Sequence, residues 1–295
     1  MSTNSATNRP VGESPGERGL PARRPVTVFL LLALAIGLPV LAIPVVLGLP
    51  TEPFLLVLVF VALLGSALLV TRLADGAGAV RHLLSRVLIW RFGVGRWAVV
   101  LFGVPVLTMA VAAASGTLST PEKGWLIEVG WYLFNTLIFG ALILNLWEEM
   151  AWAGFAQSRL MARHGLVVAS LITAVFFAVI HLPLYLEGDP TRSEVAIGLA
   201  ILFAMAPVYR YLIGMHLLDT GGSILAVGVQ HASWNAALNL DAVDGGDWEW
   251  QVPVAVVLLT AMVASGRRFR PPSDRPIGRE AEKSAAAEWI HPKPR

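Results

Sequence analysis

Long apolar runs alternate with short polar connectors along most of this chain. About 20 consecutive apolar residues are enough for an α-helix to cross a bilayer. Measured against that length, the pattern predicts about eight membrane-spanning helices, at roughly 26–49, 53–71, 97–115, 129–150, 166–186, 195–217, 222–240 and 251–266. The sequence therefore predicts an all-α, polytopic membrane protein.

The composition agrees with a membrane environment and limits the possible chemistry. Of the 295 residues, 56% are hydrophobic and 14% are charged, whereas a soluble domain carries roughly 25% charged residues. Cysteine is absent, which excludes a thiol nucleophile, disulfides and a cysteine-based zinc site. The basic residues lie at the ends of apolar runs and not in a cluster with exposed aromatic residues, so nothing indicates nucleic-acid binding.

Polar segments flank the apolar region at both ends. Residues 1–25 are rich in Ser, Pro, Gly and Arg, which predicts a disordered cytoplasmic arm. The first apolar run is longer than a signal-peptide core and is expected to stay in the membrane. Residues 26–265 are therefore interpreted as the membrane domain, and the charged, Pro-rich residues 266–295 as a loose cytoplasmic tail.

Basic residues gather in alternate connectors. They precede the first run and follow the second, fourth and last runs, as Arg9, Arg18, Arg23, Arg24, Arg72, Arg81, Arg86, Arg91, Arg96, Arg159, Arg163, Arg267, Arg268 and Arg270. The other connectors are rich in Asp and Glu and carry few cations. Because Lys and Arg favour the cytoplasmic side, both termini are predicted to be cytoplasmic, in a protein of a bacterial-type plasma membrane.

One basic connector has a helical pattern of its own. Within residues 80–92, apolar and polar side chains fall on different faces: Val80, Leu83, Leu84, Val87 and Leu88 against Arg81, Ser85 and Arg86. This pattern predicts an interfacial amphipathic helix along the cytoplasmic surface of the membrane. The alternative is a simple basic connector.

Two adjacent carboxyl groups, Glu148 and Glu149, fall inside a predicted span. Insertion of a charged carboxylate at the centre of a membrane helix costs roughly 2.5–3.5 kcal/mol, so ionisable residues at this depth usually serve a function. Such groups require polar partners. The later spans offer few, chiefly His181, Arg210, His231 and Asn235.

Helical spacing groups several of these residues. Phe177 and His181 are four residues apart and share one helix face. His231 and Asn235 have the same spacing, and the small residues around them allow close helix approach. This spacing is typical of a site assembled from several helices.

The chemistry that fits these groups is amide hydrolysis. A carboxylate with an imidazole can take a proton from water, and His and Asn N–H groups can stabilise the resulting oxyanion. The hypothesis is that Glu148 and His181 activate water. His231 and Asn235 then form the oxyanion hole. Taken alone, each group also has a simpler interpretation, as a hydrogen bond between helices or as a proton or ion site.

The same residues resemble the motifs of the CPBP family, which comprises the CAAX prenyl-protease and bacteriocin-processing (Abi) intramembrane proteases. The family motifs are Glu-Glu-x-x-x-Arg, Phe-x-x-x-His and His-x-x-x-Asn. In chain order they correspond to Glu148-Glu149, Phe177 with His181, and His231 with Asn235. The resemblance covers roughly residues 80–240, the expected protease core.

The resemblance implies an all-helical membrane core and a metal-independent glutamate protease. Such a hydrolase cleaves a membrane-associated or lipidated protein. By analogy, Glu148 is the catalytic base and His181 is its partner. His231 and Asn235 are the oxyanion donors, Glu149 is a supporting residue, and no cofactor is expected.

One position departs from the family pattern. The motif arginine is replaced by Ala153, so Glu149 lacks its usual partner. Arg210, in the sixth predicted span, is the candidate replacement because it lies at membrane depth. Arg210 and Phe177 complete the supporting residues. The replacement of the motif arginine could mean that the protein has a different substrate or that it has lost catalytic activity.

The leading prediction is therefore an intramembrane endopeptidase whose partners are a membrane-associated protein or peptide substrate and the lipid bilayer. A non-catalytic family member that binds membrane peptides in immunity or regulation is the alternative. A transporter is less favoured, because the sequence shows no internal repeat. Glu148, His181 and His231 could also ligate zinc, but no His-Glu-x-x-His helix is present, so a metal-free site is preferred.

Overall fold

The chain is all-α in the computed structural model, which describes residues 19–243, 250–268 and 279–292. In chain order the helices are α1 (Leu20–Arg23), α2 (Pro25–Leu47), α3 (Glu52–Val57), α4 (Ser66–Ser85), α5 (Val94–Ser115), α6 (Trp125–Phe134), α7 (Leu146–Glu149), α8 (Ser158–His164), α9 (Leu166–Ile180), α10 (Arg192–Asp219), α11 (Ile224–Ala237), α12 (Gln251–Arg268) and α13 (Arg279–Ile290). Wider π-helical turns occupy Leu58–Gly65, Asn135–Asn145 and Met150–Gln157, and 3₁₀ turns occupy Arg86–Leu88 and Leu182–Leu186. The predicted fold class is confirmed.

Several of these elements join into longer helices. Among the described residues, five are long and apolar enough to cross a membrane: Pro25–Leu47, Glu52–Leu88, Val94–Ser115, Trp125–His164 and Arg192–Asp219. The other three predicted spans also fold as helices but are shorter or more polar. α9 has 15 residues, α11 has 14, and α12 has 18 and ends in two arginines. The protein is therefore a polytopic membrane protein, as predicted.

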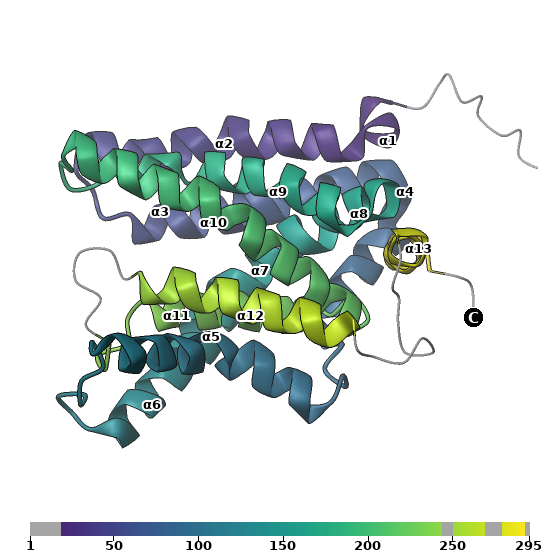
Figure 1. The fold of residues 1–295 in the computed structure, drawn as a ribbon. Helices are drawn as coiled ribbons and strands as arrows, with labels where there is room; N and C mark the ends of the chain where they lie inside the picture. The colour runs from purple at the N-terminus through teal and green to yellow at the C-terminus, as the bar shows by residue number, and fades with distance from the viewer. Residues whose placement is uncertain (1–18, 244–249, 269–278, 293–295) are drawn as a thin grey trace, which may run out of the picture.

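The 40-residue helix Trp125–His164, called the central helix below, runs through the bundle between two groups of helices. Figure 1 shows α2, α9 and α10 on one side and α5, α11 and α12 on the other. The first half of the central helix contacts α11, and its second half contacts α4 and α9. Because lipid offers no hydrogen bonds, such continuous helices satisfy their backbone groups internally.

Small residues let α11 approach the central helix closely. A Cβ added to Gly228 would lie 2.8 Å from the Cα of Leu146, and a Cβ added to Gly140 would lie 2.6 Å from the Cβ of Ala232. Small side chains at membrane helix contacts permit this kind of backbone approach. The contact fixes α11 against the part of the central helix that carries the two adjacent glutamates.

The predicted amphipathic helix is only partly observed. Gly76 has φ 87° and ψ 179°, so helical geometry stops at this glycine and resumes after it. Arg86, which the sequence pattern puts on a polar face, is instead buried at 2% exposure. Its Nε donates to the Gly222 carbonyl at 2.8 Å and its Nη1 to the Gly154 carbonyl at 3.0 Å. The long side chain reaches inward to these carbonyls, and the position of the segment at a membrane surface stays a prediction.

The expectation of a loose C-terminal tail is wrong for residues 279–290. These form α13, which packs beside α8 (Figure 1). Ala286 is fully buried, and the Trp289 ring lies against Gly222 and 5.2 Å from the guanidinium of Arg86. Half of the residues of this helix are polar or charged, so its docking depends on these few tertiary contacts and not on a long apolar run.

The two described ends of the chain lie on the same side of the bundle. α1 and α13 both contact α4, and Figure 1 shows them at one end of the molecule. This arrangement agrees with an even number of crossings, while the cytoplasmic assignment of that side stays a prediction. The remainder of the predicted arm, residues 1–18, and residues 269–278 of the tail lie outside the described residues.

Replacing Gly228 by alanine should destabilise the protein by about 1–3 kcal/mol, because the new methyl group meets the backbone of the central helix. Thermal unfolding in detergent measures this effect as a lower midpoint. Gly130→Ala is the matched control, because a Cβ at that exposed helical position meets nothing within 4 Å. Equal midpoints for the two variants would contradict the close contact.

Candidate active site

The central helix brings Glu148 and Glu149 into the interior of the bundle. Glu149 is fully buried and Glu148 is 7% exposed. Adjacent residues on a helix project about 100° apart. The two carboxylates therefore meet different partners, although they are neighbours in the sequence.

Glu149 is bound by a cation from α10. Nη1 of Arg210 lies 2.7 Å from Oε1 of Glu149 and 3.0 Å from Oε2. Both side chains are fully buried. Nδ1 of His231 donates a second hydrogen bond to Oε1 at 3.0 Å. A charge taken out of water needs a partner and further hydrogen bonds, and this carboxylate has both.

Gln157 fixes the guanidinium from the opposite side. Its Oε1 accepts hydrogen bonds from Nε and Nη2 of Arg210 at 3.1 Å and 2.6 Å. Its Nε2 donates to the Arg210 carbonyl at 2.8 Å and to Oγ of Ser170 at 3.2 Å. The arginine is thus held by an acceptor on each side, and its orientation toward Glu149 is set by the packed interior.

The pairing of Glu149 with Arg210 is the contact that the sequence analysis predicts. Ala153, at the position of the family's motif arginine, is fully buried. The cation that binds Glu149 comes from a different helix, at a separation of 61 residues. The substitution at Ala153 therefore leaves this carboxylate with a guanidinium partner.

Glu148 has weaker contacts. Its Oε2 accepts a long hydrogen bond from Nδ2 of Asn145 at 3.5 Å. Nε2 of His181 lies 4.0 Å from its Oε1, and Nδ1 of His231 lies 4.0 Å from its Oε2. Oε1 is buried and accepts no hydrogen bond from the described residues. The carboxylate therefore retains capacity to bind another group.

His181 ends α9 with its ring turned toward Glu148. Nδ1 donates to the carbonyl of Phe177 at 2.5 Å, in the direction that the four-residue spacing predicts. The Phe177 ring packs 4.5 Å from the imidazole. With Nδ1 bound to a carbonyl, a neutral ring presents Nε2 as an acceptor toward the carboxylate.

Asn235 joins the site through a residue that the sequence analysis did not select. Its Nδ2 donates to Oδ1 of Asn145 at 3.3 Å. Asn145 therefore links Asn235 to Glu148. Unlike the glutamates, Asn235 is exposed, and it is the point at which the site meets the surrounding cavities.

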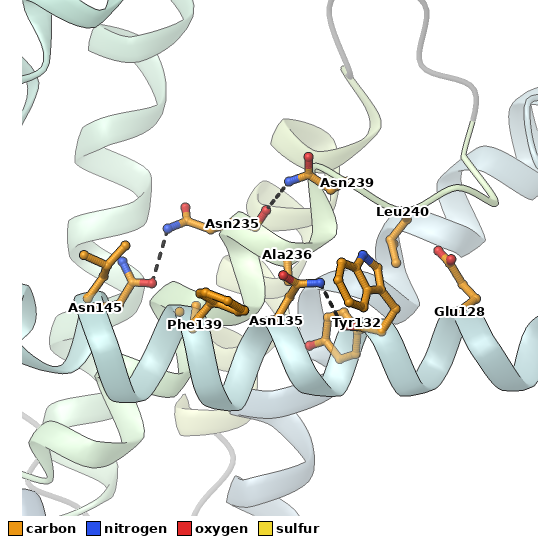
Figure 2. A pocket seen from close by; sticks show the side chains of 13 residues that line it. Glu128, Tyr132, Asn135, Phe139, Asn145, Asn235, Ala236, Asn239 and Leu240 are labelled. Atoms are coloured by element: carbon orange, nitrogen blue, oxygen red, sulfur yellow. Dashed lines mark hydrogen bonds between the residues drawn. The ribbon is translucent and has the colours of Figure 1, made fainter. Parts of the chain in front are cut away.

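Two cavities meet at Asn235. One has a volume of about 320 Å³ and is lined by Phe177, His181, Leu184, Tyr185, Leu202, Tyr209, His231, Trp234, Asn235 and Leu238. The other, shown in Figure 2, has a volume of about 410 Å³ and runs between the central helix and α11. The first is mainly aromatic and aliphatic, and the second contains four asparagines. A chain lying across Asn235 would contact both.

Asn145, Gln157 and Tyr209 are the contributors that sequence reasoning missed. Asn145 precedes Glu148 by one helical turn, which is a usable signal. Gln157 is the last residue of a π-helical stretch that changes the register of the faces, so its position was harder to predict. Tyr209 packs between His231 and Trp234, with ring centroids 5.3 Å and 4.1 Å away.

Metal ligation is the other chemistry that these residue types allow. In the described part of the chain, no group of three or more His, Asp or Glu side chains is arranged to hold a metal ion. Of the candidate zinc ligands, His231 already directs Nδ1 to Glu149.

Arg210→Gln should destabilise the protein by about 3–5 kcal/mol, because it leaves Glu149 as an uncompensated buried carboxylate. Adding Glu149→Gln should recover part of the loss, with a coupling of about 1–3 kcal/mol in a double-mutant cycle measured by unfolding in detergent. Arg163→Gln, on the exposed surface of α8, is the control and should change little. Additive effects of the two buried substitutions would contradict the pairing.

Two comparisons relate part of this chain to known proteins. Residues 129–237 match the family model described as type II CAAX prenyl endopeptidase Rce1-like. CAAX prenyl protease 2 of Methanococcus maripaludis is 27% identical over 134 residues, which is 41% of this chain and 49% of that protein. The chain thus spans about half the length of the curated relative. The matched segment contains all seven candidate site residues, and both matches support a similarity to the CAAX prenyl proteases.

Proposed function

We propose that the protein is an intramembrane endopeptidase that hydrolyses a peptide bond in a membrane-associated or lipidated protein. The observation that carries the proposal is the arrangement around Glu148. Its unbonded Oε1 lies 4.0 Å from Nε2 of His181, and His181 lines a cavity together with His231 and Asn235. The similarity to a CAAX prenyl protease supports the reaction class.

The two glutamates have separate tasks in this proposal. Glu149 is engaged by Arg210 and His231 and serves as a fixed anion that positions them. Glu148 has weaker contacts and lies 4.0 Å from His181, a residue that lines the cavity, so it is the base. Different surroundings for neighbouring carboxylates are a common way to divide acid–base roles within one site.

Water activation fits the distance between Glu148 and His181. A gap of 4.0 Å is too long for a direct hydrogen bond, but one water molecule can bridge it. The water gives its proton to Glu148 while its oxygen attacks the peptide carbonyl carbon. The C–N bond then breaks, and the proton passes from Glu148 to the departing amine.

The tetrahedral intermediate needs donors for its oxyanion. Nδ2 of Asn235 offers one N–H, because its bond to Asn145 uses only one of two. His231 can offer a second from Nε2. Since Nδ1–H already donates to Glu149, the ring must then carry both protons, and this charge lies beside the carboxylates of both Glu149 and Glu148.

The alternative is a non-catalytic protein, and the argument for it is that Ala153 cannot supply a cation to Glu149. Arg210 weakens this argument, because it supplies a guanidinium to Glu149 from another helix. Binding of membrane peptides without cleavage remains the competing function, and it requires the same cavities but not the carboxylate of Glu148. The two functions therefore differ in the effect of a single isosteric substitution.

Glu148→Gln should lower cleavage by about 10²–10⁴-fold, the usual contribution of a positioned general base. Quantitative terminal proteomics of membranes from cells expressing each variant measures it as the loss of new protein termini. Glu52→Gln, which changes an exposed carboxylate in α3, is the control and should match the unchanged protein. If all samples contain the same protein termini at equal expression of the variants, the result would favour the binding role.

Activity should be insensitive to a strong, membrane-permeant chelator, because the proposed mechanism draws its base and its donors from side chains. The measurement is the rate of appearance of the termini that depend on Glu148, with and without chelator. Loss of activity that added Zn²⁺ restores would overturn the metal-free mechanism.

A further inference from the structure

The two ends of the helix bundle differ in charge. One end, called the arginine-rich end below, joins α4 to α8 through Arg159 and Asp75, with Nη2 and Oδ2 2.6 Å apart. At the same end Nη1 of Arg267 lies 2.6 Å from Oδ1 of Asp219. Buried Arg86 contributes a further cation there.

The opposite end is rich in carboxylates and is called the acidic end. Oδ2 of Asp241 accepts a hydrogen bond from the backbone N–H of Glu122 at 2.8 Å. Oε1 of Glu128 accepts one from the backbone N–H of Asp241 at 2.8 Å. Oε1 of Glu187 accepts one from the hydroxyl of Thr51 at 2.6 Å. These bonds join the connectors of this end in two pairs.

A path leads from the site to the acidic end. The 410 Å³ cavity begins at Asn145 and Asn235, passes Asn135 and ends at Glu128 and Asn239. Figure 2 shows this succession of polar side chains along the central helix and α11. A second cavity of about 330 Å³ shares Glu128 and Asn239 and continues along Glu122, Lys123 and Asp241. We call the two together the asparagine groove.

The asparagine groove suits the main chain of an extended peptide. Nδ2 of Asn135 donates to the Trp131 carbonyl at 2.9 Å, and Nδ2 of Asn239 donates to the Asn235 carbonyl at 3.0 Å. An asparagine side chain has two N–H donors and a carbonyl acceptor, so each amide keeps further capacity. Such groups can pair with peptide N–H and C=O groups of any sequence.

Toward the arginine-rich end the interior is filled. Trp152, Ala153 and Phe155 of the central helix are fully buried. A Cβ at Gly154 would lie 2.7 Å from the Ile224 side chain, and Arg86 bonds to the Gly154 carbonyl. A cavity of about 420 Å³ at this end shares no lining residue with the site cavities.

We propose that the substrate reaches Glu148 through the asparagine groove from the acidic end, and that this end is extracytoplasmic. The connectors at the arginine-rich end carry more arginine than those at the acidic end. This bias assigns the arginine-rich end to the cytoplasm. The substrate class is then a membrane-anchored protein or peptide whose cleaved segment lies outside the cytoplasm, in extended form. The part of this inference that concerns the substrate rests on the proposed protease function. The location of the groove does not.

The absence of cysteine from the chain allows a direct test. Asn239→Cys and Glu122→Cys place single thiols in the groove and at its mouth, and Ser85→Cys places one on the exposed surface of the arginine-rich end. A bulky, charged, membrane-impermeant maleimide is applied to right-side-out and to inverted membrane vesicles. The same vesicles are assayed for the termini that depend on Glu148.

We expect the groove thiols to react in right-side-out vesicles and the Ser85→Cys thiol to react only in inverted ones. Labelling a groove thiol should lower cleavage by about tenfold or more relative to the same unlabelled variant. Labelling Ser85→Cys should leave cleavage unchanged. Because two groove positions are used, the test still gives a result if one of the two variants does not fold.

Opposite results overturn the proposal. Groove thiols that react only in inverted vesicles would show that the groove opens to the cytoplasm. Full cleavage after complete labelling of both groove thiols would show that the substrate takes another route. If no termini depend on Glu148, the protease function fails instead, and the labelling pattern still decides which side the groove faces.

Discussion

The buried pair of Glu149 and Arg210 is the interaction on which the interior of this protein depends. Neither charge has access to water, and each would destabilise the bundle without the other. Their contact, with the bond from His231, ties the central helix, α10 and α11 to one point. The neighbouring Glu148 is thereby left as the less constrained carboxylate, near His181 and the cavity that His181 lines.

Packing and polarity are distributed unequally around that point. On one side, buried aromatic and small residues fill the space between helices, and Arg86 satisfies carbonyls at a helix junction. On the other side, asparagines line open volume between the central helix and α11. The same pair of helices therefore supplies rigidity at one end and access at the other, and an active site needs both.

The sequence was most informative where the membrane restricts the choices. Apolar runs had to become helices, because lipid satisfies no backbone groups. Arg210 could be matched to Glu149, because a charge at that depth requires an opposite one. Arg86 was misplaced, because a basic residue beside an apolar run looks the same whether it points outward or inward. Docking of α13 could not be foreseen, since it depends on tertiary contacts of Trp289 and Ala286 within a polar segment.

The burial of Arg86 has a consequence for how the protein is assembled. Its carbonyl partners, Gly154 and Gly222, follow it by 68 and 136 residues, and Trp289 follows all the membrane helices. When the helix that carries Arg86 enters the bilayer, none of these groups has been synthesised, and water must solvate the guanidinium. The arginine-rich end therefore closes at the last stage of assembly, and a newly made chain differs from the mature protein most at that end.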